Sequence, residues 1–441
     1  MQFGLFGSAA ARRGGPEFDS SEGFRDFVEY NIEAEALGFH STFVVEHHFT
    51  GYGQVSATLN LLTWLGARTR WLRLGTAVIV LPWHNPVLLA EQAATLDLLS
   101  GGRLDFGIGK GYRYNEFAGF CVPMEEADAR FDEALHVIIN AWTADQPFFH
   151  RGKYWQFDNI VVEPPTAQKP HPPIWMGAGS ERSIRRVAQQ GYNLLLGQYA
   201  SPEDVAGSIA VFRDAVEASG RHFDPMQVGV TRAFFVTDRE GDKEAAMERR
   251  LQNRMRQLKL ATRPDGTVHG GPDRATGDPR AVNEASAMYG NPDEIARRLQ
   301  SLREAGVGYV LINGGGSGGG TRGRESLRRF AREVMPIFAE AHLSGWRSDR
   351  GYGFSNSLPI TWPLSRSSCA RAASESGKRS WISGRMRPAA RWLSRMFIVA
   401  ARMSGRSSKL WIVKNRSAGL TAELARIAPS KSAFGGPSSR P

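Results

Sequence analysis

The sequence has none of the long apolar segments that a membrane protein needs. No apolar run among its 441 residues reaches the roughly 18 residues of a membrane span. The first residues, MQFGLF, carry no basic stretch ahead of an apolar one, as a secretory signal would. We therefore expect a soluble, cytoplasmic protein with no membrane partner.

Cysteine is also scarce. The two cysteines, Cys121 and Cys369, lie far apart in the sequence and lack the spacing of metal ligands, so neither a disulfide framework nor a zinc site is predicted. The adjacent histidines His47 and His48 lack the i, i+4 spacing of a helical zinc pair, and no third ligand is marked. No bound metal is expected.

Acidic residues become rare near the C-terminus. From Trp346 onward there are 18 Lys and Arg against three acids, which leaves 37 of the 55 basic and 41 of the 44 acidic residues in the preceding part. The net charge of +11 therefore belongs to an Arg/Ser-rich tail without helical or strand periodicity. We predict one folded domain over 1–345 and a disordered basic tail over 346–441. A nucleic-acid-binding arm is the alternative, but the tail's few aromatics do not alternate with its basic residues as stacking platforms would.

Short apolar runs alternate with amphipathic helical stretches through residue 342, the pattern of βα units and a parallel sheet. Nearly continuous apolar strands are typical of a sheet that is buried on both faces. The expected strands are 2–6, 41–48, 72–82, 104–111, 172–179, 192–197, 228–236 and 309–315, with clear helices at 21–37, 293–304 and 325–341. This order predicts an α/β fold, specifically a (β/α)8 TIM barrel.

The second expected strand ends in three polar residues, Glu46, His47 and His48. In a TIM barrel the reactive groups lie at the C-terminal ends of the strands. Histidine is a suitable general base near neutral pH, and adjacent side chains on a strand point to opposite faces. One histidine is therefore expected to face the barrel mouth while the other contacts the scaffold.

Several segments together resemble one family. EHHFTGYG, GTAVIVLPWHNPVLLAEQAATLDLLSGGRLDFGIGKG, PPIWMGAGSERSIRRVAQQG and YGNPDEIARRLQSLREAGVGYVLINGGG are similar to the alpha-subunit side of bacterial luciferase and its flavin-dependent relatives. The resemblance covers nearly all of residues 1–342 and none of the tail. Relatives that use a deazaflavin usually carry a DH pair where this chain has EHHF.

The resemblance implies a role for individual residues. His47 matches the essential histidine, with Glu46 and His48 beside it as further catalytic residues. A non-proline cis peptide that cradles the flavin ring would join Ala77 and Val78.

The resemblance also implies a phosphate site for FMN. Lys110 and Ser180 match its basic residue and its serine, and Gly179 lies in the glycine-rich turn before a helix, where free backbone N–H groups favour an anion. Two positions depart from the family. The reactive cysteine of luciferase is Gly109, and the second phosphate arginine falls at Asp128, with Arg130 nearby as a substitute.

The implied enzyme is a flavin-dependent monooxygenase. Reduced FMN, supplied by a separate flavin reductase, would react with O2 to form a flavin C4a-hydroperoxide that oxygenates a small organic substrate, with an aldehyde as one candidate. A homodimer is expected, and the Gly/Pro/Asp-rich segment 262–283 resembles the mobile lid of the family. The alternatives are a deazaflavin-dependent oxidoreductase and a non-catalytic flavin-binding protein.

Overall fold

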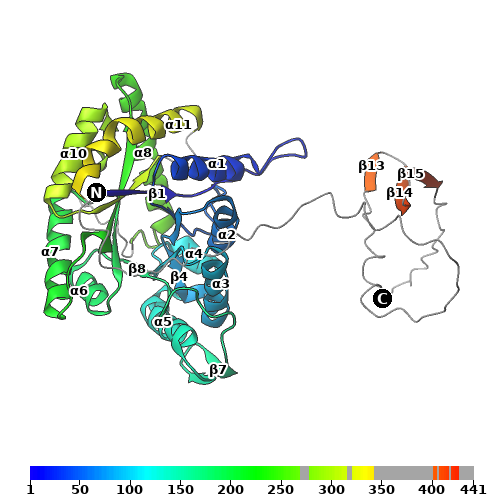
Figure 1. Cartoon of the computed structure of the whole chain (residues 1–441), viewed down its shortest axis with the longest axis horizontal. Helices are drawn as coiled ribbons and strands as arrows, with labels where there is room; N and C mark the ends of the chain where they lie inside the picture. The colour runs from blue at the N-terminus through cyan, green and yellow to red at the C-terminus, as the bar shows by residue number, and fades with distance from the viewer. Residues whose placement is uncertain (269–277, 315–319, 342–400, 405–406, 417–418, 427–441) are drawn as a thin grey trace, which may run out of the picture. The chain divides into compact units, whose positions relative to one another are not determined.

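The computed structural model describes residues 1–268, 278–314, 320–341, 401–404, 407–416 and 419–426. Its contacts divide the chain into two compact units, Met1–Tyr352 and Gly353–Pro441 (Figure 1). Among the described residues, no helix combines the length and the apolar character needed to span a membrane.

The first unit is built on a closed parallel barrel. Each barrel strand pairs in parallel with the next, and the last, β12, pairs with β1 through Gln2 and Tyr309. The barrel strands are β1 (Gln2–Gly7), β2 (Ser41–Val44), β3 (Arg73–Thr76), β5 (Leu104–Gly109), β8 (Ile174–Gly177), β9 (Asn193–Leu196), β10 (Val228–Val236) and β12 (Tyr309–Asn313). This order confirms the predicted (β/α)8 barrel.

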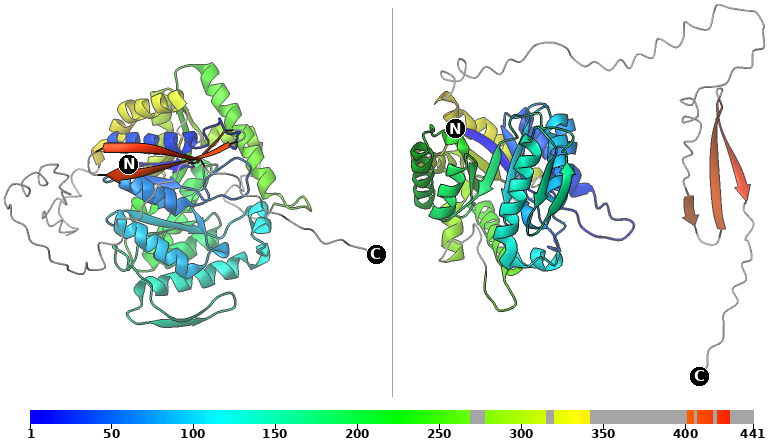
Figure 2. Two further views of the ribbon diagram at one scale, coloured as in Figure 1. Left: turned by 90° about the vertical axis from the view of Figure 1, so that its right-hand side faces the viewer. Right: turned by 90° about the horizontal axis from the view of Figure 1, so that it is seen from below.

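Helices surround the barrel on its outside (Figures 1 and 2). The helices that follow successive strands are α1 (Glu22–Ala36), α2 (Thr58–Arg68), α3 (Pro86–Leu99), α5 (Ala127–Thr143), α6 (Glu181–Gln189), α7 (Pro202–Ala218), α10 (Pro292–Glu304) and α11 (Gly320–Arg329). Insertions add β4 (Ile79–Val80), α4 (Tyr114–Gly119), the hairpin β6 (Phe148–Arg151) and β7 (Gln156–Ile160), α8 (Glu240–Ala261), α9 (Pro279–Ser286) and β11 (Met288–Gly290). Three short 3-10 turns are η1 (Leu81–Trp83), η2 (Met124–Glu126) and η3 (Pro225–Gln227), and after α11 the chain continues as the π-helical segment η4 (Phe330–Val334) and the 3-10 helix η5 (Met335–Ala341).

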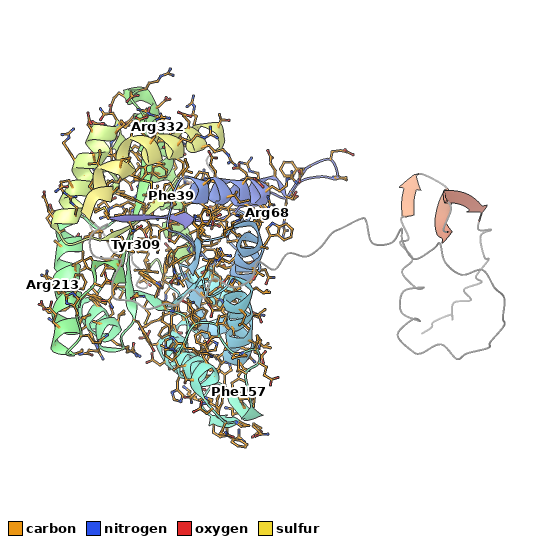
Figure 3. The ribbon with its side chains drawn as sticks, viewed as in Figure 1. Phe39, Arg68, Phe157, Arg213, Tyr309 and Arg332 are labelled. Atoms are coloured by element: carbon orange, nitrogen blue, oxygen red, sulfur yellow. The ribbon has the colours of Figure 1, made fainter. Side chains whose placement is uncertain are left out.

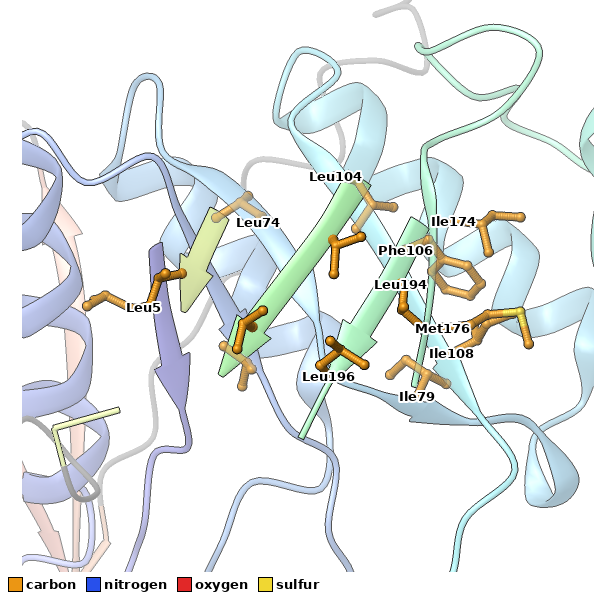
Figure 4. Packing of buried hydrophobic residues seen from close by; sticks show 14 of the residues in the cluster. Leu5, Leu74, Ile79, Leu104, Phe106, Ile108, Ile174, Met176, Leu194 and Leu196 are labelled. Atoms are coloured by element: carbon orange, nitrogen blue, oxygen red, sulfur yellow. The ribbon is translucent and has the colours of Figure 1, made fainter. Parts of the chain in front are cut away.

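The apolar residues form two layers around the strands. The larger cluster fills the space between the barrel and its helices, and Figure 4 shows Leu5, Leu74 and Ile108 among its members. The smaller cluster fills the barrel itself: the rings of Phe43 on β2 and Trp175 on β8 lie 5.4 Å apart although these strands are not neighbours. Figure 3 shows Tyr309 in the interior of this unit and Arg213 and Arg332 on its outer side. The barrel is therefore a packed core rather than a pore, which leaves only its ends for chemistry.

Two predicted segments differ in the structure. The closing helix expected at 325–341 begins earlier, at Gly320, and leaves α-helical geometry after Arg329. Pro336 lies in the η5 turn, and proline cannot donate the backbone hydrogen bond that an α-helix needs. The Gly/Pro/Asp-rich composition of the expected lid at 262–283 predicts a loop, but α9 begins inside it at Pro279, capped by Asp278. Residues 269–277 of that segment lie outside the described residues.

The second unit contains three described strands. β13 (Ala401–Ser404), β14 (Ser407–Arg416) and β15 (Gly419–Arg426) form an antiparallel sheet in this order. The rest of 346–441 lies outside the described residues, and there the disorder stays a prediction.

Truncation after Gly345 is expected to leave the thermal midpoint of the barrel and its flavin affinity nearly unchanged. The barrel closes through β12, and its described interior clusters contain no residue beyond Phe338. Thermal unfolding and flavin titration of the truncated and full-length chains test this. A large loss of folded protein on truncation would contradict it.

Candidate functional site

The C-terminal ends of the barrel strands open into one large cleft of about 3390 Å³. Residues from the loops after most barrel strands line it, including Ser8, His47, Lys110, Ser180, Gln198 and Gly314. Ligand pockets for small molecules usually measure about 300–1,000 Å³, so this cleft has room for a cofactor and a second molecule together. It lies at the end of the barrel where TIM-barrel enzymes carry their active sites.

His47 lies in this cleft and is held by a carboxylate. Its Nδ1 is 2.9 Å from Oε1 of Glu116, which is itself buried on α4. A carboxylate oxygen accepts hydrogen bonds, so we assign the ring proton to Nδ1 and the lone pair to Nε2. Burial lowers the pKa of His47 and outweighs the opposing hydrogen bond to Glu116. His47 is therefore neutral near pH 7, with Nε2 able to accept a proton.

Glu46 lines the same cleft, but its side chain is almost fully enclosed by hydrogen-bond donors. Its side chain is buried, with 2% exposed, and it accepts hydrogen bonds from Nε2 of His48 and Nε2 of His84, both at 2.7 Å. The backbone N–H of Val80 and the indole N–H of Trp83 also donate to it, at 2.9 and 3.2 Å. Burial alone would raise the pKa of Glu46, but the hydrogen bonds from His48, His84 and Val80 lower it to about 2. These contacts hold the Glu46 carboxylate in place, and its predicted catalytic role stays a prediction.

His48 also lines the cleft, so the two histidines do not divide between the mouth and the scaffold as strand alternation predicted. Strand β2 ends at Val44, not at His48, and the alternation of a strand therefore does not extend to these residues. The His48 ring bonds Glu46 and packs edge-on against Phe120, with ring centroids 4.8 Å apart. His48 is thus fixed by its neighbours on both sides.

Sequence reasoning missed the residue that holds His47. Glu116 lies 69 residues further along the chain, and its Oε1 also accepts the backbone N–H of His48 at 3.0 Å. Arg113, almost fully buried, has its Nη1 4.0 Å from the same oxygen. The only local signal for Glu116 in the sequence was the cluster of charged residues that follows Lys110.

The expected cis peptide between Ala77 and Val78 is present, and both residues line the cleft. Val78 explains one departure from the family pattern. A Cβ added to Gly109 would lie 2.6 Å from Cγ2 of Val78, closer than real Cβ contacts, so a cysteine at 109 would require Val78 to move. The contact of Ala77 and Val78 with a flavin stays a prediction.

The expected phosphate residues follow the neighbouring strands β5 and β8 and line the same cleft. Ser180 caps α6 by accepting the backbone N–H of Ser183, and an added Cβ at Gly177 or Gly179 would meet open space. The free N–H groups of this helix start therefore face an accessible region that favours an anion. Lys110 also lines the cleft, but its Nζ is 2.7 Å from Oδ1 of Asp128. Asp128, which stands where the family has its second phosphate arginine, thus pairs with Lys110, the expected phosphate lysine.

Arg130 is not brought into the cleft. Its Nε bonds Oε2 of Glu126 at 2.9 Å, and its guanidinium lies over the ring of Tyr154, 4.4 Å from the ring centroid. A contact between Arg130 and a flavin phosphate would require the side chain to leave both partners. Within the described residues, no group of three or more His, Cys, Asp or Glu side chains is arranged to hold a metal ion.

Known proteins share this architecture. The chain is 26% identical over 360 residues to the oxygenase component of a flavin-dependent trigonelline monooxygenase from Acinetobacter baylyi, covering 78% of this chain and 97% of that one. It is 26% identical over 333 residues to an FMNH(2)-dependent dimethylsulfone monooxygenase from Pseudomonas putida, covering 71% of this chain and 88% of that one.

A solved structure agrees with these sequence relatives. The crystal structure of monooxygenase RslO1 from Streptomyces bottropensis superposes with a TM-score of 0.65 at 26% identity and covers 77% of this chain and all of that one. Residues 1–308 match the family described as luciferase-like monooxygenase. On this match, with the closed barrel and its cleft, the chain belongs to the luciferase-like monooxygenase family.

Proposed function

We propose that this protein is a monooxygenase that uses reduced FMN and O2 to oxygenate a small organic substrate. The observation that carries the proposal is the convergence of four segments on one cleft: His47 after β2, Ala77 and Val78 after β3, Lys110 after β5, and Ser180 after β8. These residues fit a flavin with its phosphate at Lys110 and the start of α6 and its ring near the peptide between Ala77 and Val78. The names of two relatives, one FMNH(2)-dependent and one flavin-dependent, support the choice of cofactor.

Reduced FMN, when bound, supplies the electrons that activate O2, and the side chains supply position and proton handling. His47 accepts a proton at Nε2, and Glu116 keeps the imidazole in the required tautomer through Nδ1. Glu46 fixes the backbone of Val80, two residues beyond Val78, and orients His48 and His84. An aldehyde substrate remains a prediction.

A separate flavin reductase is proposed as the source of reduced FMN. The trigonelline relative is named as an oxygenase component, a name that implies a partner protein in that system. A separate reductase would deliver flavin that is already reduced, so the cleft would have to hold only the flavin and the substrate.

The decisive experiment mixes the full-length protein anaerobically with reduced FMN or with a reduced deazaflavin, and then admits oxygen. We expect reduced FMN to bind and its oxidation by O2 to show a protein-dependent absorbance change. Tight binding of the deazaflavin alone would favour a deazaflavin-dependent oxidoreductase. Binding of FMN without turnover of any substrate would favour a non-catalytic flavin-binding protein.

Lys110→Ala is expected to weaken FMN binding by about 1.5 kcal/mol, the low end for a lost charge-assisted hydrogen bond, because the Lys110 side chain is partly exposed. Asp128→Asn is the matched test, since it removes the carboxylate that competes with phosphate for Lys110. It should strengthen FMN binding by up to about 1 kcal/mol. Neither change should affect riboflavin, which lacks the phosphate. Fluorescence titration of both flavins measures this, and equal losses for FMN and riboflavin would contradict the assignment.

We propose a homodimer that buries the outer face of α2 and α3, two helices that pack side by side. Trp64 on α2 is 60% exposed, and Leu88 and Leu99 on α3 are 55% and 69% exposed. Neighbouring large apolar side chains on a surface mark interaction sites. Sedimentation should therefore give a dimer for the wild type and a monomer for Trp64→Glu combined with Leu99→Glu. A monomeric wild type would refute the proposal.

A further inference from the structure

One wall of the cleft carries positive charge that no acidic side chain among the described residues neutralises in an ion pair. Helix α8 turns one face toward the cleft, and Arg249, Arg250, Asn253 and Arg256 on that face line it. We call Arg249, Arg250 and Arg256 the arginine face of α8. Among the ion pairs that described residues form, none includes an arginine of this face, whereas other cleft arginines are paired, such as Arg186 with Asp132.

The surroundings of Arg250 keep its charge in place without cancelling it. The side chain is 7% exposed, and its Nη1 and Nη2 donate to the side-chain and backbone oxygens of Gln198 at 3.1 and 3.0 Å. Its guanidinium lies 4.5 Å from the ring centroid of Tyr199, and its Nε has no hydrogen-bond partner among the residues that the structure describes. Every one of these partners is neutral, and a buried charge is stabilised mainly by an opposite charge.

A second buried arginine, Arg232, is repelled by the charge of Arg250. Arg232, on β10, donates only to backbone oxygens, those of Gly197, Ala200 and Thr231. Burial, together with repulsion from Arg250, lowers the pKa of Arg232 to about 10. The region behind the arginine face therefore adds positive potential to the cleft instead of offsetting it.

The arginine face lines the same cleft as the residues proposed to act on the substrate, and two contacts link α8 to their surroundings. The guanidinium of Arg256 is 5.9 Å from the ring centroid of Tyr52, which lies in the loop that follows His47 and His48. Helix α4, which carries Glu116, packs against α8. A molecule bound to the arginine face is thus held in the same cleft as the His47–Glu116 pair.

We propose that the arginine face of α8 binds an anionic group of the substrate, so that the enzyme acts on a small organic anion such as a carboxylate, a sulfonate or a phosphate ester. The planar guanidinium group matches these oxyanions through paired hydrogen bonds, and Asn253 lies one helical turn from both Arg249 and Arg256 to add an amide donor. That the bound anion is a substrate rests on the proposed monooxygenase function, whereas the anion site itself does not depend on it.

The test uses the full-length protein saturated with FMN, so that the flavin phosphate site is filled. Calorimetry compares matched pairs: benzoate with benzamide, octanoate with octanamide, and octanesulfonate with octanol. At least one anion is expected to bind about tenfold or more tightly than its neutral partner, the effect of one charge-assisted hydrogen bond. Equal binding within every pair, or no binding of any, would overturn the proposal.

The variants Arg250→Gln and Arg256→Gln should each abolish most of this preference for the anion. Arg256 is exposed, so its variant keeps the test open if Arg250→Gln does not fold. Lys259→Gln is the matched control, because Lys259 is exposed on the same helix and does not line the cleft, and it should leave the preference intact. If the preference for the anion survives in both arginine variants, the site is refuted. It is also refuted if Lys259→Gln loses the preference to the same extent as the arginine variants.

One further comparison separates the anion site from the flavin phosphate site. The arginine variants should bind FMN and riboflavin with the same ratio of affinities as the wild type. If they instead weaken FMN alone, the arginine face holds the flavin phosphate and the proposal is wrong. A wild type that binds the anion selectively but consumes no oxygen with reduced FMN would refute the monooxygenase function and leave the anion site standing.

Discussion

His47→Ala is expected to lower the yield of oxygenated product by at least about 100-fold, the lower range for a general acid–base group. Reduced FMN should still bind, because the proposed phosphate residues Lys110 and Ser180 lie in the loops after two other strands, β5 and β8. Oxygen should still be consumed, with hydrogen peroxide released in place of product. An oxygen electrode combined with a peroxide assay measures both quantities.

The pH profile of the wild type offers a second readout. Burial lowers the pKa of His47, so the neutral base should persist below pH 6.5 and product formation should fall only as the pH drops through the lowered pKa. Glu116→Gln removes the carboxylate that holds Nδ1 and should change this profile more than it changes flavin binding.

Two further variants serve as controls for His47. His136→Ala, on the exposed side of α5 and outside the cleft, should leave the yield unchanged. His48→Ala should act mainly through stability, because His48 is bonded to Glu46 and packed against Phe120. Full product yield in His47→Ala together with its loss in His48→Ala would reverse the assignment of the two histidines.

Glu46→Gln should reduce the free energy of unfolding at pH 7 by about 3 kcal/mol. The lowering of the Glu46 pKa from 4.5 to about 2 corresponds to a stabilisation of this order, at about 1.4 kcal/mol for each unit. A glutamine keeps the shape of the side chain. Its NH2 group, however, cannot accept the hydrogen bonds that the Glu46 carboxylate accepts. Urea unfolding at several pH values measures the difference.

The sign of the pH dependence follows from the lowered pKa. The stabilisation by Glu46 is fully present above pH 4.5 and is lost as the pH falls through the folded-state pKa, so the deficit of the variant should shrink below pH 4.5. Glu29→Gln is the control, since Glu29 is half exposed with a single ion pair to Arg68, and such pairs contribute less than about 1 kcal/mol. An equal loss in both variants would contradict the role given to the buried network.

The sequence alone was sufficient for the fold. Each of the barrel strands was predicted from an apolar run between helical stretches, and the helix from Pro292 was marked by the Asn–Pro start that caps it. These patterns are local: a strand or a helix start is encoded by residues within a few positions of one another. The motif EHHF and the match to the family likewise lie in contiguous residues, so family membership was also predictable.

Only the tertiary structure decided which side chains meet. The fold brings Glu116 to His47 and Asp128 to Lys110, places Glu46 among four hydrogen-bond donors, and directs Arg130 toward the β6–β7 hairpin. It also sets the arginines of α8 against the cleft. His47 and Glu116 belong to different βα units, whereas Lys110 and Asp128 belong to the same one; in both pairs the partners lie too far apart along the chain for a local periodicity to predict their contact. The physical reason is that a side chain's partner depends on how neighbouring strands are registered and tilted, which is fixed when the sheet closes.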